Sequence, residues 1–394
     1  MIDQSFNINE NCTGCYACYS VCPQSCISML ANEEGFIFPS VNSIKCVRCG
    51  KCMSVCPILN PDEREFEPSA IACQNRINSS RIKSSSGGVF VALSERIIEL
   101  EGVVYGAAFN SNFEVEHKSV DSHENIHILQ GSKYVQSKIG DSFIHAKEQL
   151  SSGKHVLFSG TPCQIAGLMK YLGKKYERLL TIDIVCHGVP SPAVFKKYIE
   201  ARERLARSRV TEISFRDKKM GWKNFSMRIC FENKRVYCRS KDQDPYLKSF
   251  LQNGTLRRSC YACRFKGEKR HSDITLADFW GVQNLMPDID DDKGTSLVLL
   301  HSPTGKQMFE SIAGDIFSNP ADVSEALKYN SAALNSVKRS PFRDQFIKEV
   351  TNDNFIKLAH KYFSESPNIR IRRRLLMVIK KLRLEKLVRK IRKK

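Results

Sequence analysis

Hydrophobic and polar positions alternate along the middle of this chain in two rhythms. Short apolar runs typical of strands are followed by longer runs in which apolar residues return every three or four positions, as in a helix. In chain order these runs cover residues 70–74, 89–100, 103–109, 155–158, 164–172 and 179–185. Strands that alternate with helices favour a mainly parallel sheet with helices on its faces, so this region is predicted to be an α/β domain.

Later in the chain the pattern changes. Two short alternating runs, 227–231 and 236–238, flank a polar turn and predict a hairpin. From about residue 302 the pattern becomes more helical, with candidate helices at 305–316 and 344–363. A charged stretch bounded by prolines predicts a linker. The expected organisation is an N-terminal domain over 1–60, a linker over 61–69, an α/β domain over 70–300, a helical C-terminal region over 301–369 and a tail over 370–394.

The cysteines are the most specific chemical signal. The chain has 16 of them, and nine lie before residue 57. Eight of these form two copies of C-x2-C-x2-C-x3-C-P, offset by 34 residues. This spacing wraps three corners of a 4Fe-4S cube and sends the fourth thiolate to the neighbouring cluster. One predicted cluster takes Cys12, Cys15, Cys18 and Cys56, and the other takes Cys22, Cys46, Cys49 and Cys52.

Zinc is the alternative metal for paired C-x2-C units, but zinc has no use for the doubled four-cysteine motif. Residues 1–60 resemble the bacterial two-cluster ferredoxins, which implies an α+β ferredoxin-like domain with two 4Fe-4S clusters. Cys26 and Cys73 are predicted to be small buried residues. Cys230 and Cys238 are predicted to be core or surface thiols.

Four further cysteines, at positions 163, 186, 260 and 263, lie outside these groups. Cys163 and Cys186 each follow a strand-like run, and ligands of open α/β sheets gather beyond the carboxyl ends of strands. Cys260 and Cys263 form a C-x2-C unit. Spacing alone leaves two alternatives open: the four thiols meet in one metal site, or they are unrelated.

Two loops could hold a phosphate-bearing cofactor. Residues 84–88, Ser-Ser-Ser-Gly-Gly, lie between a strand-like and a helix-like run, where backbone N–H groups can bind an anion or simply cap the helix. In the loop 131–134, Lys133 could lie beside a flavin ring or in solvent. The chain contains neither G-x-G-x-x-G nor G-x-x-x-x-G-K-[ST], so nothing in it supports a Rossmann nicotinamide site or a P-loop NTPase.

Composition and charge narrow the class of protein. The chain has 394 residues, 42% of them hydrophobic, and a net charge of +19. No signal peptide and no transmembrane run is recognisable, so we expect a cytoplasmic protein. Residues 370–394 carry 13 Lys or Arg and one acid. This tail lacks aromatic residues, which argues against nucleic acid as a partner and favours an anionic membrane face, with peripheral attachment on the inner side.

Five motifs then appear in a characteristic order, at residues 84–89, 131–135, 159–167, 183–192 and 272–281. Together they resemble the beta-subunit family of coenzyme F420-reducing hydrogenases and dehydrogenases, over about residues 70–300. The resemblance implies FAD, an iron–sulfur cluster in the same domain, and two-electron chemistry at the flavin fed by single electrons. Some members of the family are encoded beside cell-surface polysaccharide genes.

Carried over by position, the resemblance implies several site residues. Phosphate binding falls to Ser85, Ser86, Gly87 and Gly88, and flavin contacts fall to Ser132, Lys133 and Tyr134. A third 4Fe-4S cluster falls to Cys163, Cys186, Cys260 and Cys263. His187, beside Cys186, is the candidate proton donor to a reduced substrate, and a structural loop histidine is the alternative.

The expected function is an iron–sulfur flavoprotein oxidoreductase that acts on a small organic substrate. A ferredoxin or reductase is the expected redox partner, and cell-surface polysaccharide biosynthesis is one expected setting. The alternative is a non-catalytic electron-transfer subunit that serves a partner redox enzyme.

Overall fold

The computed structural model describes residues 1–5, 7–62, 66–350 and 353–364. The basic tail expected over residues 370–394 lies outside the described residues, as do parts of the linker 61–69 and of the region 301–369. Within the described part of the chain, no helix has both the length and the apolar character needed to cross a bilayer.

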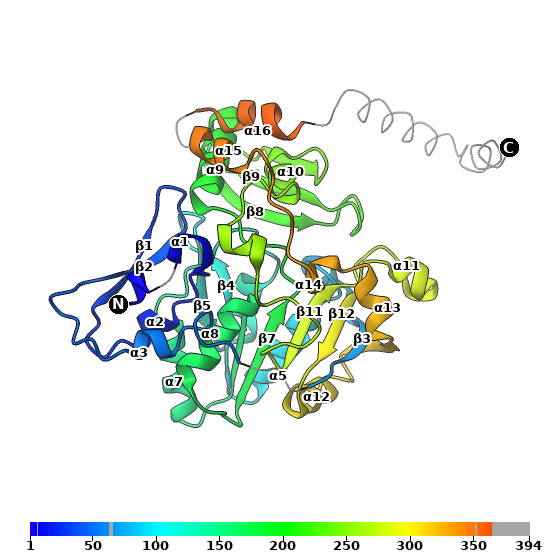
Figure 1. Cartoon of the computed structure of the whole chain (residues 1–394). Coiled ribbons are helices and arrows are strands. Elements are labelled where there is room, and N and C mark those ends of the chain that lie inside the picture. Colours follow the sequence, from blue (N-terminus) through cyan, green and yellow to red (C-terminus); the bar gives the residue numbers. More distant parts are fainter. Residues whose placement is uncertain (6, 63–65, 351–352, 365–394) are drawn as a thin grey trace, which may run out of the picture.

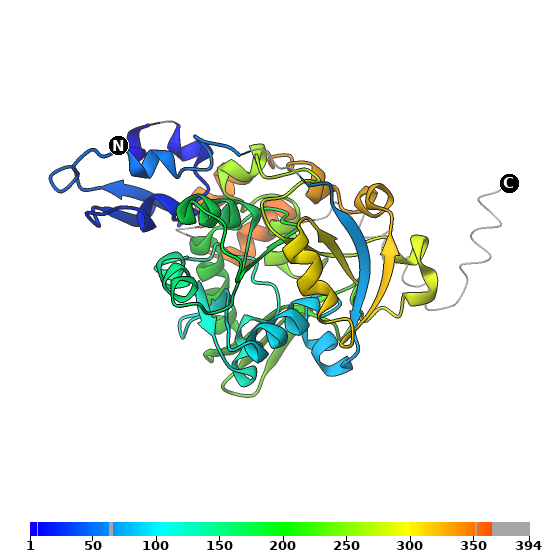
Figure 2. The ribbon, with the colours of Figure 1, turned by 90° about the horizontal axis from the view of Figure 1, so that it is seen from below.

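The N-terminal region projects from one side of the molecule, at the left of Figures 1 and 2. Strands β1 (Ile27–Ala31) and β2 (Ile37–Val41) form an antiparallel hairpin beside the short helix α1 (Ile8–Asn11). Two more single-turn helices, α2 (Ala17–Ser20) and α3 (Lys51–Ser54), start 34 residues apart, which is the offset of the cysteine repeat. The repeat in sequence is therefore also a repeat in local structure.

An eight-stranded mixed sheet forms the centre of the molecule (Figure 1). Its strand order is β13-β3-β12-β11-β7-β6-β4-β5. The bounds of its strands are β3 Ser69–Asn75, β4 Val103–Phe109, β5 Val115–Val120, β6 Val156–Gly160, β7 Leu179–Ile184, β11 Ile274–Asp278, β12 Ser296–Leu300 and β13 Ile316–Ala321. The predicted strands at 70–74, 103–109, 155–158 and 179–185 all belong to this sheet.

The prediction of a mainly parallel sheet is wrong. Only the central strands β4, β6, β7 and β11 run parallel, whereas β5, β12, β3 and β13 each pair antiparallel with a neighbour. Five residues, 110–114, join β4 to β5. Such a connection is too short for the crossover that parallel neighbours need, so β5 returns antiparallel.

Helices cover both faces of this sheet. Helix α5 (Val89–Glu99) packs with α12 (Pro303–Glu310) on one face, in the cluster that contains Leu157. Helices α7 (Ser142–Ser151) and α8 (Pro162–Leu172) pack on the other face, with Phe158. Consecutive residues of β6 thus point to opposite faces, which explains why the predicted strand there is a continuous apolar run.

A second, three-stranded sheet lies above the first in Figure 1, in the order β10-β9-β8. The predicted hairpin is present as β9 (Ser226–Phe231) and β10 (Val236–Ser240), and β8 (Val210–Asp217) adds a strand that the pattern did not predict. A large aromatic core joins this sheet to four helices, α9 Pro192–Ala206, α10 Pro245–Leu251, α15 Arg343–Val350 and α16 Phe355–Phe363.

The region after residue 301 is less helical than its pattern predicts. The helix expected at 305–316 ends at Glu310, and Ile316 instead begins β13 at the edge of the large sheet. An edge position accommodates Pro320, which has no N–H to donate to a further strand. The remaining short elements are η1 Ile2–Gln4, α4 Asn78–Lys83, η2 His123–Asn125, α6 Ile126–Leu129, η3 Arg258–Ala262, α11 Val282–Leu285, η4 Pro287–Ile289, α13 Val323–Lys328 and α14 Ser331–Leu334.

Candidate metal centres and cofactor loop

The first predicted cluster has a cavity of its own. Apolar residues of the N-terminal domain, such as Ile2 and Met29, line it together with the four predicted ligands, Cys12, Cys15, Cys18 and Cys56. Burial raises the pKa of the Cys15 thiol to about 12, and the neighbouring Cys12 and Cys56 thiols act in the same direction. Buried thiolates that face one another need a cation between them, so these residues fit a metal cluster.

Backbone geometry wraps the chain around this cavity. Gly14 and Tyr16 both have left-handed backbone conformations, with φ of +68° and +70°. The turn they make brings the Gly14 N–H within 3.4 Å of the Cys12 sulfur, which accepts its hydrogen bond. In the second repeat Gly50 takes the same conformation as Tyr16, with φ of +77°. Arg48 likewise takes the conformation of Gly14, with φ of +54°, so both repeats use two left-handed residues before their short helix.

The second predicted set is more open. Sulfur atoms of Cys22 and Cys26 lie 3.4 Å apart, and Cys26 also interacts with Cys46. Cys26 is buried, as its small apolar character predicts. Cys52 is half-buried near the N-terminus, and Cys49 is exposed. This set therefore lies at the surface of the projecting region, whereas the first set faces inward.

The four cysteines that the sequence left unpaired come together. Cys163 lies in the first turn of α8, Cys186 follows β7, and Cys260 and Cys263 lie on and just after η3. The thiol of Cys163 interacts with all three others, and Cys260 also interacts with Cys186 and Cys263. Burial raises the pKa of Cys260 to about 12.

Local capping places the first of these thiols. Helix α8 begins at Pro162 with a capping box, in which Thr161 and Gln164 bond to each other's backbone N–H groups. The Thr161 hydroxyl also lies 3.2 Å from the Cys163 sulfur. On the opposite side, the Val189 N–H donates to the Cys260 sulfur at 3.4 Å.

Basic side chains surround this third thiol group, and sequence reasoning missed them. Lys266 and Arg270 lower the pKa of Cys186, although burial has the larger effect and raises it. Arg257 is buried beside Cys260 and donates from Nε to the Cys12 carbonyl oxygen at 2.7 Å. In the sequence, these basic residues are visible only as a basic run around the C-x2-C unit. The run did not show which thiols they face, because Cys163 and Cys186 come from distant segments.

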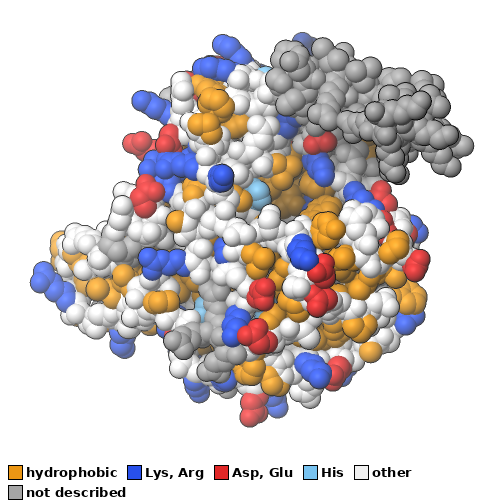
Figure 3. Space-filling model, turned by 45° about the vertical axis from the view of Figure 1, so that its right-hand side comes forward, with side chains coloured by type: hydrophobic (Ala, Val, Ile, Leu, Met, Phe, Trp, Pro, Cys, Tyr) orange, Lys and Arg blue, Asp and Glu red, His pale blue; other side chains and the backbone are white. Residues whose placement is uncertain are grey.

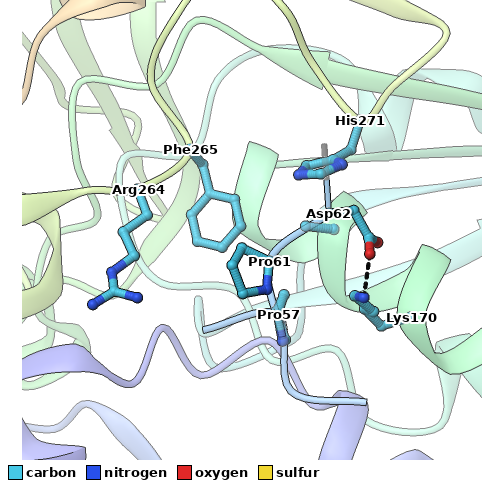
Figure 4. Close-up of a pocket in the computed structure, with 8 residues that line it drawn as sticks. Pro57, Pro61, Asp62, Lys170, Arg264, Phe265 and His271 are labelled. Carbon is cyan, nitrogen blue, oxygen red and sulfur yellow. Dashed lines mark hydrogen bonds and ion pairs between the residues drawn. The ribbon is translucent and has the colours of Figure 1, made fainter. Parts of the chain in front are cut away.

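The two groups of thiols are close neighbours. A methyl group on Gly167, one turn after Cys163 in α8, would lie 2.9 Å from both the Cβ and the sulfur of Cys15. Phe265 and Ala166 belong to one hydrophobic cluster with cysteines of both groups. Figure 4 shows the same junction from the side of a small cavity, where Pro57 and Pro61 of the N-terminal region lie beside Phe265. Among the described residues, no three His, Cys, Asp or Glu side chains are arranged to hold a single metal ion.

The loop Ser84–Gly88 connects α4 to α5 and meets Ser132. Ser85 Oγ accepts from the Ser132 N–H at 2.7 Å and from its hydroxyl at 2.8 Å. Ser86 Oγ donates to the Thr295 carbonyl oxygen, and the Gly87 N–H donates to Ser296 Oγ at 2.9 Å. A Cβ at Gly87 would lie 2.2 Å from the Cys73 carbonyl oxygen, so close packing on β3 already requires this glycine.

Lys133 does not face solvent. Its buried ammonium donates to the carbonyl oxygens of Ile128, Leu129 and Gln130 at 3.1, 3.0 and 2.9 Å, which caps the C-terminal end of α6. Burial lowers the pKa of Lys133 to about 7. In this arrangement the Lys133 ammonium stabilises the C-terminal end of α6.

Tyr134, in the same loop, contacts a buried ion pair that the sequence did not reveal. Its hydroxyl accepts from Arg216 at 3.1 Å, and Arg216 makes two bonds to Asp278 at 2.7 and 3.0 Å. Trp222 donates to the same carboxylate and stacks on Trp280 with ring centroids 4.9 Å apart. Arg216 and Asp278 are 62 residues apart in the chain, so no local pattern could pair them.

His187 lies between the third thiol group and Tyr134. Its Nε2 is 2.7 Å from Asn253 Oδ1, and its ring meets the Phe250 ring edge-on at 5.1 Å. Phe250 in turn lies 4.7 Å from the Tyr134 ring. Burial lowers the pKa of His187. The surface in Figure 3 is hollowed between the parts of the molecule built on the two sheets, and hydrophobic side chains and a histidine lie in the hollow.

Comparisons with known proteins found similarity in both parts of the chain. Residues 153–324 match the family described as the C terminus of the coenzyme F420 hydrogenase/dehydrogenase beta subunit, and residues 11–59 match the 4Fe-4S dicluster domain. A similar solved chain belongs to the F420-reducing [NiFe] hydrogenase complex from Methanosarcina barkeri, with 16% identity, a TM-score of 0.46, and coverage of 71% of this chain and 98% of that chain. No curated protein matches this chain.

A 4Fe-4S dicluster domain followed by an α/β domain of a redox family defines an iron–sulfur protein of oxidoreductase type. Over residues 153–324 the chain matches the coenzyme F420 hydrogenase/dehydrogenase beta-subunit family, and over residues 11–59 it matches the dicluster domain, as its motifs predicted. The family match covers the third thiol group and begins after Ser85 and Lys133, so the two loops that contain these residues lie outside it.

Proposed function

We propose that this chain is an iron–sulfur flavoprotein oxidoreductase. Electrons enter singly at the N-terminal domain and leave in pairs to a small organic substrate. The observation that carries the proposal is the meeting of Cys163, Cys186 and Cys260 with Cys263, next to the helix that touches Cys15. A 4Fe-4S cluster exchanges one electron at a time, and a flavin joins single electrons into pairs.

The cysteines would hold three clusters in this scheme. The eight cysteines of the repeat would hold two, with Cys12, Cys15, Cys18 and Cys56 around the inner cavity. The third thiol group would hold another, for which the cations Lys266, Arg270 and Arg257 would balance the thiolate charge. The rival occupant is zinc, which needs four sulfurs about 3.8 Å apart, as set by Zn–S bonds of about 2.3 Å.

Flavin binding is proposed for the loop Ser85–Gly88 with Ser132, Lys133 and Tyr134. Support comes from the paired hydroxyls of Ser85 and Ser132 close to the N-terminal end of α5, where backbone N–H groups favour a phosphate. Lys133 would have to leave the α6 carbonyl oxygens to reach a flavin, or act from where it is. Tyr134 and Phe250 offer aromatic contact on the side of His187.

His187 is proposed to donate a proton to the reduced substrate. Its hydrogen bond with Asn253 fixes the ring, and its position next to Cys186 places it between the third thiol group and Tyr134. Coenzyme F420 is the substrate that the family description suggests. An intermediate of cell-surface polysaccharide synthesis is the alternative substrate.

A second candidate function is a non-catalytic electron-transfer subunit. The family description names a beta subunit, which favours a chain that works with partner subunits in a redox complex. The two functions differ in one measurement. An enzyme reoxidises its reduced flavin with a small-molecule acceptor in the absence of any partner protein, whereas a subunit does so only with its partner.

The proposal is tested by iron and flavin content under anaerobic conditions. Full-length protein should approach about twelve irons per chain, and Cys260→Ser should fall towards about eight while the signals of the N-terminal clusters persist. The matched control is Cys230→Ser, a half-buried thiol on β9 outside the three groups, which should keep full iron content. If Cys260→Ser and the unchanged protein both hold eight irons, or if zinc replaces iron, the third cluster is wrong.

A further inference from the structure

A stretch of the projecting N-terminal domain exposes apolar side chains to solvent. Ile44 is 95% exposed, Val47 is 62% exposed and Met53 is 38% exposed. Most buried apolar residues of this domain turn inward to the hydrophobic cluster that holds the inner cysteines. These three side chains instead form, with the residues between them, what we call the 44–53 face. Exposed apolar residues gathered in this way mark interaction sites.

The same face is basic. Lys45, Arg48 and Lys51 alternate with the apolar residues, and all three are exposed. Between Glu34 and Asp62 the chain has no acidic residue at all. An apolar centre with cations around it fits a partner whose docking surface is acidic with an apolar centre.

The 44–53 face includes three of the four cysteines of the second predicted set, which we call the outer thiol group. Cys46, Cys49 and Cys52 belong to this segment, and Cys49 is itself exposed. A Cβ at Gly50 would meet no atom within 4 Å, so solvent reaches the backbone here. A protein seated on this face would lie directly over these thiols.

The other side of the domain is already engaged with the body of the molecule. At the tip of the β1–β2 hairpin, a Cβ at Gly35 would lie 2.6 Å from the Ala193 backbone nitrogen of α9. Glu34, next to it, pairs with Arg343. The 44–53 face begins beyond the other end of β2, so it remains outward on the part of the molecule that projects at the left of Figures 1 and 2.

We propose that the 44–53 face docks a small, acidic, one-electron carrier protein. The proposal rests on the proposed function, because it requires a cluster on Cys22, Cys46, Cys49 and Cys52. In the transfer, the reduced carrier would lose one electron, and the cluster held by these four cysteines would gain it. No bond forms or breaks and no proton moves.

The test compares how fast two reductants reduce the full-length holoprotein in a stopped-flow experiment. One reductant is a small acidic two-cluster ferredoxin, reduced beforehand, and the other is dithionite. The variant carries Lys45→Glu, Arg48→Glu and Lys51→Glu. Its matched control, with the same charge change, carries Lys154→Glu, Lys174→Glu and Lys175→Glu, exposed lysines on loops that follow α7 and α8.

The face variant should lose at least about tenfold in the rate constant with ferredoxin at low salt, while the control stays within about twofold. Added salt should slow the wild-type reaction and hardly affect the face variant. A second variant, Ile44→Ser with Val47→Ser, should weaken ferredoxin binding without changing the salt dependence. Iron content and dithionite reduction should remain unchanged in all variants.

Three results would overturn the proposal. They are equal ferredoxin rates for the face variant and wild type, equal loss in the control, and binding of the face to phosphatidylglycerol vesicles without any effect on ferredoxin. Failure of the proposed function is distinguishable, because dithionite would then reduce no third cluster or flavin in the unchanged protein. A docking failure leaves that dithionite reduction intact.

Discussion

Cys15 of the N-terminal domain lies against Gly167 of α8, with no room for even a methyl group between them. Residue 167 is one turn after Cys163. This contact therefore joins the first predicted set of thiols, which contains Cys15, to the third thiol group, which contains Cys163. Helix α8 has a cysteine in its first turn and a glycine in its second turn. Because the glycine has no side chain, a metal cluster in the neighbouring domain could lie close to this helix. The contact also makes the junction sensitive to a single carbon atom.

We expect Gly167→Ala to lower stability although alanine is the better helix former. In open space the substitution in a helix would add up to about 1 kcal/mol. Here the new Cβ would lie 2.9 Å from two atoms of Cys15, so Cys15 or α8 must move. The melting temperature and the iron content should both fall. Electron transfer from the N-terminal clusters to the rest of the protein should become slower.

Gly314→Ala is the control for this prediction. Its added Cβ would meet nothing within 4 Å, so it tests the substitution without the contact. Equal melting temperatures and transfer rates for the Gly167 variant and wild type would show that the junction is looser than the structure indicates.

A second prediction concerns the ion pair that ties the hairpin tip to α15. Arg343 is fully buried and donates to Glu34 at 2.7 Å and to the Leu256 carbonyl oxygen at 3.0 Å. We expect Arg343→Met to cost about 3 kcal/mol of unfolding free energy, because it leaves both acceptors without this donor. Hydrogen exchange of residues 27–41 should also become faster, since the hairpin loses one of the two arginines that pair with Glu34.

Arg339→Met provides the comparison. Arg339 pairs with Asp344 at the surface, with 38% of its side chain exposed, so its loss should cost less than about 1 kcal/mol. If both variants cost the same, burial of the pair does not set its strength.

The third prediction is a pH dependence caused by Lys133. Burial lowers its pKa from 10.5 to about 7, so between these values the unfolded chain binds a proton that the folded chain lacks. The unfolding free energy of wild type should therefore rise with pH in this range. From pH 7 to pH 9 the gain relative to Lys133→Met should be about 2 kcal/mol.

Chemical denaturation at several pH values measures this difference in protein prepared without added flavin. Below pH 7 the difference between the two proteins should stop changing, because both states of wild type are then protonated at Lys133. A constant difference from pH 7 to pH 9 would mean that Lys133 stays charged in the fold, held by its three carbonyl acceptors.

A fourth prediction concerns the tail, residues 370–394. Each basic residue near an anionic membrane is worth up to about 1 kcal/mol, so 13 suffice for reversible attachment. Full-length protein should float with phosphatidylglycerol vesicles at low salt, and protein ending at residue 369 should not. Equal flotation of the two forms would assign the attachment to another part of the molecule.

Local sequence was sufficient for several elements. The cysteine motif repeats after 34 residues, and α2 and α3 start one repeat length apart. Strand β4 covers the predicted residues 103–109, and α5 and α8 begin and end within two residues of their predicted bounds. These features depend on residues close in sequence, where periodicity and backbone preference act directly.

Only the tertiary structure decided how distant segments meet. Cys163 and Cys186 follow neighbouring parallel strands, whereas Cys260 arrives after the whole three-stranded sheet, so chain distance held no information about their approach. The direction of the outer strands was set by short connections and edge pairing rather than by apolar runs, which look alike in parallel and antiparallel strands. Arg216 meets Asp278, 62 residues further along the chain, only in the folded protein, because a buried charge needs an acceptor that packing brings near.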